Sequence, residues 1–110
     1  MNTQQIFKTR FANLRLLACF LLILGSGASN AADAIKGGEL YASHCAACHG
    51  TSGISVMPGA PNFARGEGIM RPDTLLLSAI RNGKNAMPAY QGILSDADIL
   101  DVIAFVRTIN

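Results

Sequence analysis

The sequence has little of what several protein classes require. It contains no tryptophan and only three cysteines among 110 residues, and charged side chains make up 15% of it. Its longest apolar run, residues 16–24, has nine members, far fewer than the roughly 20 that a helix needs to span a bilayer. So few cysteines exclude a disulfide framework, and the length excludes a second domain.

The apolar run has the features of a secretory signal peptide. Three basic residues precede it, a Gly-Ser-Gly break ends it, and small residues follow at Ser29 and Ala31, the positions that signal peptidase reads. We predict cleavage after Ala31, so that residues 1–31 are a signal peptide and residues 32–110 form one mature domain. Such export predicts a periplasmic protein.

Two other processing routes and an uncleaved anchor remain alternatives. Cleavage after Ala34 would also follow small residues, and Cys19 superficially resembles a lipoprotein cleavage site. A lipid anchor is disfavoured because Arg15 interrupts the stretch before Cys19 and apolar residues continue after it.

Cleavage removes the basic character of the chain. The formal charge of the whole sequence is +2, but the leader holds three of the nine basic residues and none of the acidic ones, which leaves a mature charge of −1. This balance gives no case for nucleic-acid binding. A domain of about 80 residues seldom obtains more than roughly 3–5 kcal/mol from its core, so we expect a covalent or metal staple.

The mature chain contains one chemically specific motif, Cys45-Ala46-Ala47-Cys48-His49. On a helical turn these two cysteines and the histidine lie on one face. The thiols then reach a porphyrin edge for thioether bonds while the imidazole reaches the iron. C-x-x-C-H in an exported protein therefore indicates a c-type haem, and we predict one covalent haem c on Cys45 and Cys48, with His49 as an axial iron ligand.

Three other interpretations compete with haem attachment. A zinc site needs more Cys or His ligands, and the mature chain adds only His44, which its neighbour Cys45 leaves poorly placed. A thioredoxin-like redox pair needs a βαβ surrounding, and the sequence has no such strand pattern. Chance occurrence is the third.

Hydrophobic periodicity and capping signals predict three main helices, over residues 34–48, 74–82 and 95–107, and hence an all-α fold. The helix signals are Asp33 before the first, Pro72 and Asp73 before the second, a left-handed Gly83 after it, and a Ser95–Asp98 capping box for the third. The residues available for the core are Ile35, Leu40, Tyr41, Leu75, Leu76, Ala79, Ile80, Ile99, Val102, Ile103 and Val106.

The second axial ligand is predicted to be Met87. This residue follows a whole helix, which lets the chain return to the haem face opposite His49, and Pro88 holds its backbone away from the helical region. Met57, only eight residues after His49, and Met70 are the alternatives. His44 is excluded because it shares a helix with the motif.

Further spacings match one protein family. Gly37 and Tyr41 stand before the haem motif as the family's glycine and aromatic do, and Phe105 matches its aromatic partner at the crossing of the first and last helices. Pro61, twelve residues after the motif histidine, matches the proline whose carbonyl accepts a hydrogen bond from the ligand imidazole. Residues 85–88, Asn-Ala-Met-Pro, are similar to the axial methionine loop.

On these matches, residues 33–109 resemble a small class I cytochrome c. The resemblance implies three helices with long loops, among them residues 50–70, wrapped around one covalent haem. Phe63 and Tyr90 are the candidate aromatic haem neighbours, and the Tyr90 hydroxyl is also a candidate propionate donor, because buried tyrosines usually find polar partners. The basic residues near the loops are interpreted mainly as solvated surface, with one or two as candidate propionate partners: Arg65, Arg71, Arg81 and Lys84.

A His/Met site leaves no iron position open, so the resemblance implies an electron carrier and not an enzyme. We expect a monomeric periplasmic carrier that docks transiently with redox partners, from a membrane donor to a terminal reductase or oxidase. The short layout resembles the cytochrome c-55X kind associated with nitrite reduction. An accessory haem protein that assists maturation of a partner reductase is the alternative, and an enzyme or sensor would need an open iron position.

Overall fold

The computed structural model describes residues 2–6 and 31–110 of the chain. The chain divides into two compact units, residues 1–30 and 31–110, and each is described by itself. The predicted signal peptide lies almost wholly outside the described residues; residues 3–6 form one helical turn. No helix within the described ranges is long and apolar enough to cross a membrane.

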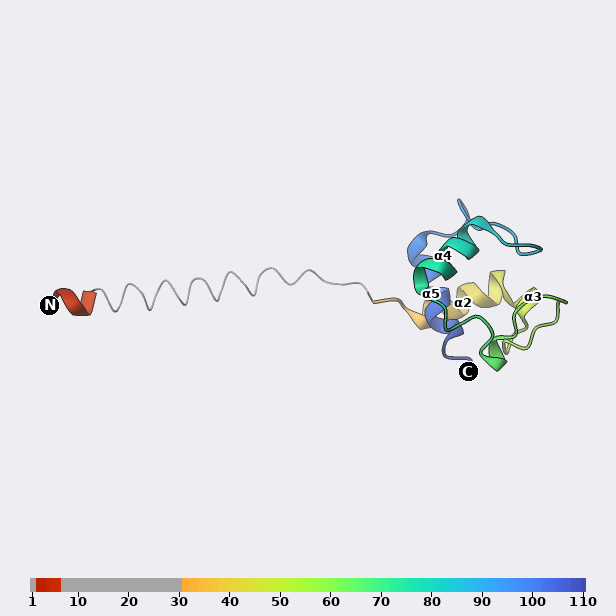
Figure 1. Cartoon of the computed structure of the whole chain (residues 1–110), viewed down its shortest axis with the longest axis horizontal. Coiled ribbons are helices and arrows are strands. Elements are labelled where there is room, and N and C mark those ends of the chain that lie inside the picture. The colour runs from red at the N-terminus through yellow and green to blue at the C-terminus, as the bar shows by residue number, and fades with distance from the viewer. Residues whose placement is uncertain (1, 7–30) are drawn as a thin grey trace. The chain divides into compact units, whose positions relative to one another are not determined.

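The second unit consists of helices joined by long loops (Figure 1). Its helices are α2 (Ala34–His44), α3 (Ala46–His49), the 3-10 helix η1 (Phe63–Arg65), α4 (Asp73–Asn82) and α5 (Asp96–Val106). Three of them, α2, α4 and α5, have ten or eleven residues. Residues 31–110 contain two isolated β-bridges but no sheet, which confirms the predicted all-α fold with three main helices.

Two of the predicted helix starts are set by the expected side chains. The Asp33 carboxylate accepts hydrogen bonds from the backbone N–H groups of Ile35 and Lys36, at 2.9 and 3.2 Å. Ser95 and Asp98 form the reciprocal capping box of α5. Each carboxylate also lies at the positive end of its helix dipole, which adds to the stabilisation.

Several local predictions are wrong. The helix expected over residues 34–48 is divided into α2 and α3 at Cys45, whose φ of −117° departs from the ideal helical value while its ψ of −34° stays in the helical region. Ile35 and Leu75 are 82% and 57% exposed, so each side chain lies on the solvent face of its helix and not in the core. Gly83 ends α4 with φ 75° and ψ 161°, an extended conformation of positive φ and not the left-handed helical one.

The first and last helices cross at close range. A Cβ on Gly37 would lie 1.9 Å from the carbonyl oxygen of Asp101, so only glycine permits this approach. Tyr41 is 1% exposed; its ring centroid lies 5.3 Å from that of Phe105, and its hydroxyl donates to the Gly50 carbonyl at 2.6 Å. The crossing is therefore tied to the end of α3, where the motif lies.

Ionic contacts and two apolar clusters hold the crossing together. The Asp33 N–H donates to the Asp101 carboxylate at 2.7 Å, and the Lys36 ammonium pairs with Asp98 and Asp101, which lowers the pKa of Asp98. The buried residues of the clusters are Tyr41, Ile69, Val102 and Val106 in one, and Leu94, Ile99 and Ile103 in the other. Four of these were predicted from the periodicity of the last helix.

Candidate functional site

The C-x-x-C-H motif lies where α2 ends and α3 begins. The N–H groups of Cys48 and His49 both donate to the Cys45 carbonyl, at 3.2 and 3.0 Å. Both cysteines are half-buried free thiols, and His49 is 9% exposed. The structure thus carries two thiols and an imidazole on one helical turn.

The environment of Cys45 differs from that of a redox-active thiol. Burial, with a smaller contribution from Cys48, raises the pKa of Cys45 to about 11. Catalytic thiols of the thioredoxin type have a lowered pKa and react as thiolates. Among the described residues there is also no group of three or more His, Cys, Asp or Glu side chains that could hold a metal ion. The site therefore fits neither the redox pair nor the zinc interpretation.

The His49 ring is held at its edge and on its face. Its Nδ1 lies 3.1 Å from the Pro61 carbonyl oxygen; because a carbonyl only accepts, Nδ1 carries the proton. The Phe63 ring, in η1, stacks on the imidazole with centroids 4.5 Å apart and planes 12° apart. Nε2 of the neutral ring is left with the lone pair that metal ligation requires.

The loop after the motif folds back onto it. The N–H groups of Val56 and Met57 donate to the Cys48 carbonyl, at 3.0 and 3.1 Å, so Met57 is fixed next to the motif turn. The Met57 side chain is 39% exposed and that of Met70 is 84% exposed. Both are more exposed than Met87, and the choice of Met87 over these alternatives stays a prediction.

Met87 is half-buried in a tight hairpin between α4 and α5. Lys84 N–H donates to the Met87 carbonyl at 3.1 Å, and Met87 N–H donates to the Lys84 carbonyl at 3.0 Å. Asn85, at the corner, has a positive φ of 53°. Further along, the Tyr90 N–H donates to the Ile80 carbonyl at 3.1 Å, which returns the segment to α4.

Tyr90 connects the Met87 segment, residues 83–91, to α2. Its hydroxyl donates to the His44 carbonyl at 2.7 Å, and the two rings meet edge to face with centroids 5.9 Å apart. Burial raises the pKa of the Tyr90 hydroxyl, which keeps its proton in place. The Tyr90 hydroxyl therefore donates to the backbone of α2 in this structure, and its role toward a propionate stays a prediction.

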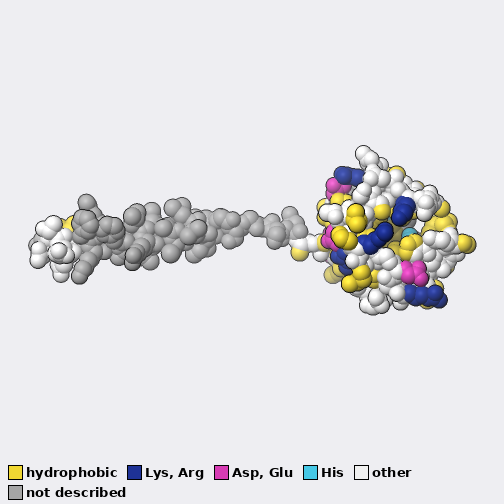
Figure 2. All heavy atoms as spheres, viewed as in Figure 1, with side chains coloured by type: hydrophobic (Ala, Val, Ile, Leu, Met, Phe, Trp, Pro, Cys, Tyr) yellow, Lys and Arg dark blue, Asp and Glu magenta, His cyan; other side chains and the backbone are white. Residues whose placement is uncertain are grey.

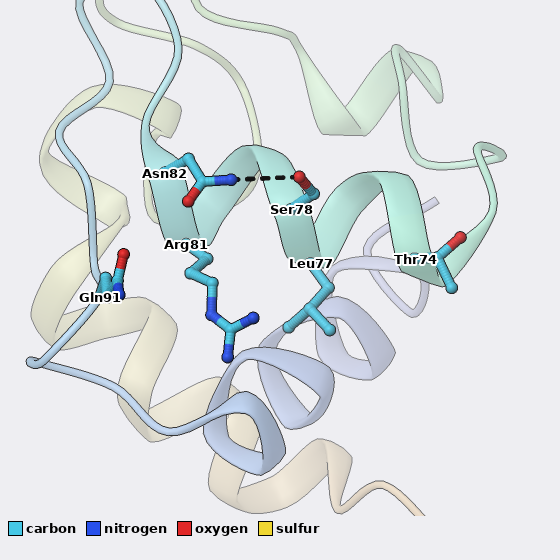
Figure 3. Close-up of a pocket in the computed structure, with 6 residues that line it drawn as sticks. All are labelled: Thr74, Leu77, Ser78, Arg81, Asn82 and Gln91. Carbon is cyan, nitrogen blue, oxygen red and sulfur yellow. Dashed lines mark hydrogen bonds between the residues drawn. The ribbon is translucent and has the colours of Figure 1, made fainter.

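The structure also has a surface hollow of about 320 Å³ beside α4 (Figure 3). Arg81, a candidate propionate partner, is paired there with Asp96 at 2.7 Å, and Asn82 donates to Ser78 at 3.2 Å. Among the lining residues, Arg81 is the one that the sequence analysis named as a candidate. Its lining residues are Thr74, Leu77, Ser78, Arg81, Asn82 and Gln91.

One contact of the Met87 segment was missed by the sequence analysis. Gly83 was identified only as the end of a helix, yet a Cβ at this position would lie 2.8 Å from the Met87 carbonyl oxygen. A glycine after a helix ordinarily indicates a C-terminal cap. No local pattern distinguishes that role from a close backbone approach.

Comparison with known proteins gives consistent matches. The family described as cytochrome C oxidase, cbb3-type, subunit III, matches residues 32–106. Cytochrome c6 of Thermosynechococcus vestitus is 36% identical over 103 residues, 90% of each chain. That of Gracilaria tenuistipitata var. liui is 34% identical over 100 residues, which cover 84% of this chain and 93% of the relative.

A solved structure is similar as well. Cytochrome c6 of the diatom Phaeodactylum tricornutum superposes with a TM-score of 0.56 at 32% sequence identity. The match covers 69% of this chain and 92% of the diatom protein. At this identity the likeness extends beyond general architecture to the sequence.

Proposed function

Because the chain belongs to the class I monohaem c-type cytochromes, to which the cytochromes c6 also belong, we propose that it carries one covalent haem c and transfers single electrons. The motif turn supports this proposal most directly. Two free thiols precede an imidazole whose Nδ1 is bound by a carbonyl, and this donor set fits thioether attachment with iron ligation through Nε2.

The haem supplies iron that alternates between the ferrous and ferric states. Cys45 and Cys48 would tether it through thioether bonds, and His49 would bind the iron. The Pro61 carbonyl fixes the tautomer and raises the basicity of the imidazole. Met87 would supply a soft thioether, which favours the ferrous state and raises the reduction potential relative to a second imidazole.

With His49 and Met87 both bound to the iron, no iron position would be open to substrate. The Met87 hairpin is closed by its paired hydrogen bonds, and Tyr90 joins the segment to α2. Side chains held in this way need little rearrangement when the iron changes charge. The proposed protein is therefore a carrier and not an enzyme.

The proposed partners are a membrane donor and a terminal reductase or oxidase, in the periplasm. On the visible face of the second unit, hydrophobic, basic and acidic side chains are interspersed (Figure 2), a mixture in which charged groups can orient a partner during brief docking. The relatives named above are cytochromes c6. They give no support to the c-55X kind, and a role in nitrite respiration stays a prediction, as does the accessory role.

Mixing the reduced holoprotein with an oxidised terminal reductase or oxidase in a stopped-flow instrument tests the carrier proposal. We expect second-order oxidation with one electron transferred per haem, and no rapid binding of carbon monoxide by the reduced protein at neutral pH. Rapid carbon monoxide binding by the wild-type protein would mean an open iron position, and would favour an enzyme or sensor.

The proposed location depends on removal of the signal peptide. Intact mass of protein exported from a Gram-negative host is expected to correspond to a chain that starts at Ala32 and carries one haem. A chain that starts before Gly25, or one with a lipid on Cys19, would contradict both the location and the freely diffusing carrier.

A further inference from the structure

The Met87 segment is built directly against the backbone of Gly83. Gly83 has φ 75° and ψ 161°, a region that is essentially closed to residues with a Cβ. A Cβ there would lie 2.8 Å from the Met87 carbonyl oxygen, 2.8 Å from the Ala89 nitrogen and 3.0 Å from the Pro88 carbonyl carbon. All three are backbone atoms, so rotation of a side chain cannot relieve the contact.

The hairpin transmits any shift at Gly83 to Met87. Lys84, the next residue, exchanges two hydrogen bonds with Met87, at 3.0 and 3.1 Å. Only Asn85 and Ala86 lie between these paired residues, and Asn85 already has an unusual φ of 53°. With only two residues between the paired backbone groups, the hairpin has little room to absorb a displacement.

The other side of the segment is also fixed. Tyr90 N–H and Gln91 N–H donate to the carbonyls of Ile80 and Arg81, at 3.1 and 3.0 Å, and the Tyr90 hydroxyl donates to His44. A Cβ at Gly83 would press on the backbone of residues 87–89. Because residues 90 and 91 are bound to α4, we expect the displacement to fall on the backbone of Met87.

We propose that Gly83 is a positioning residue for Met87, and that its missing side chain sets the distance between the methionine sulfur and the haem iron. The inference rests on the proposed ligation by Met87. A Cβ needs about 0.6 Å more than the present 2.8 Å to reach ordinary van der Waals contact. Functional constellations tolerate a displacement of only about 0.5 Å, so the added methyl group would lengthen or break the sulfur–iron contact.

Gly83→Ala in the holoprotein, beside the control Gly92→Ala, tests the inference. Gly92 also has a positive φ, of 81°, but a Cβ there would have no neighbour within 4 Å. Both variants carry backbone strain, and only the first presses on Met87. We expect Gly83→Ala to weaken the sulfur-to-iron charge-transfer band and to speed cyanide binding to the oxidised protein by about tenfold or more, given the usual cost of overpacking. Gly92→Ala should leave both properties unchanged.

Parallel measurement of Met87→Ala separates the two proposals. If Met87→Ala leaves the band unchanged, the ligation proposal fails and the inference fails with it. If Met87→Ala removes the band while Gly83→Ala keeps the wild-type band and cyanide rate, only the role of Gly83 is overturned.

A second variant keeps the inference testable if Gly83→Ala yields no haem protein. Asn85→Ala strains the corner of the same hairpin, whereas Asn85→Gly relieves it. We expect a weaker band in Asn85→Ala and a wild-type band in Asn85→Gly. A wild-type band in both would overturn the conclusion that this hairpin positions the sulfur.

Discussion

Met87→Ala is expected to abolish the weak sulfur-to-iron charge-transfer band of the oxidised protein and to open the iron to carbon monoxide and cyanide. The reduction potential should fall by on the order of a hundred millivolts, because water or another harder ligand stabilises ferrous iron less than a thioether does; axial ligands set haem potentials over a range of about 0.8 V. Absorption spectroscopy, ligand titration and a redox titration measure the three changes.

The other two methionines of residues 32–110 serve as matched controls. Met57 and Met70 are 39% and 84% exposed, and Met57 is bound through its backbone to the motif turn. Met57→Ala and Met70→Ala should therefore keep the band, the potential and the closed iron. Loss of the band in either control would assign the sulfur ligand to that residue instead.

Replacing both motif thiols, Cys45→Ser with Cys48→Ser, should make the haem extractable. Acid acetone should leave the colour of the wild-type protein on the polypeptide and remove it completely from the double variant, because serine forms no thioether. We also expect loss of helical circular dichroism from the extracted variant. Residues 31–110 contain only seven buried hydrophobic residues, and a core of this size supplies roughly 3–5 kcal/mol at most.

Ser43→Ala is a suitable control for the double variant. Ser43 lies on α2, two residues before the motif, is exposed, and its hydroxyl donates only to the Glu39 carbonyl at 2.9 Å. It should retain the covalent colour. Quantitative passage of haem into acetone from the wild-type protein would refute thioether attachment.

The sequence predicted the starts of two helices, because each start depends on hydrogen bonds between residues close together in the chain. Asp33 and Ser95 act on N–H groups two or three residues away, so the starts of α2 and α5 follow from the sequence. The exposure of Ile35 and Leu75 does not, because the covered face of a helix depends on where its partner helix crosses it. The break at Cys45 likewise has no local sequence signal.

The residues of the candidate site also differ in how far the sequence predicts them. Cys45, Cys48 and His49 form a contiguous motif whose spacing on a helical turn is set by local geometry. The contact of Pro61 with His49 depends on the course of a twelve-residue connection, and family resemblance, not residue chemistry, indicated it. The approach of Gly83 to Met87, four residues later in the same hairpin, is a close backbone contact that neither route predicted.

The crossing of α2 and α5 has a consequence for how the chain folds. The contact between Asp33 and Asp101 joins residues 68 positions apart, and closing a loop of that length costs about 4 kcal/mol in chain entropy by the logarithmic scaling. Such non-local contacts slow folding. The contact between the first and last helices therefore forms only after nearly all of residues 31–110 has been synthesised.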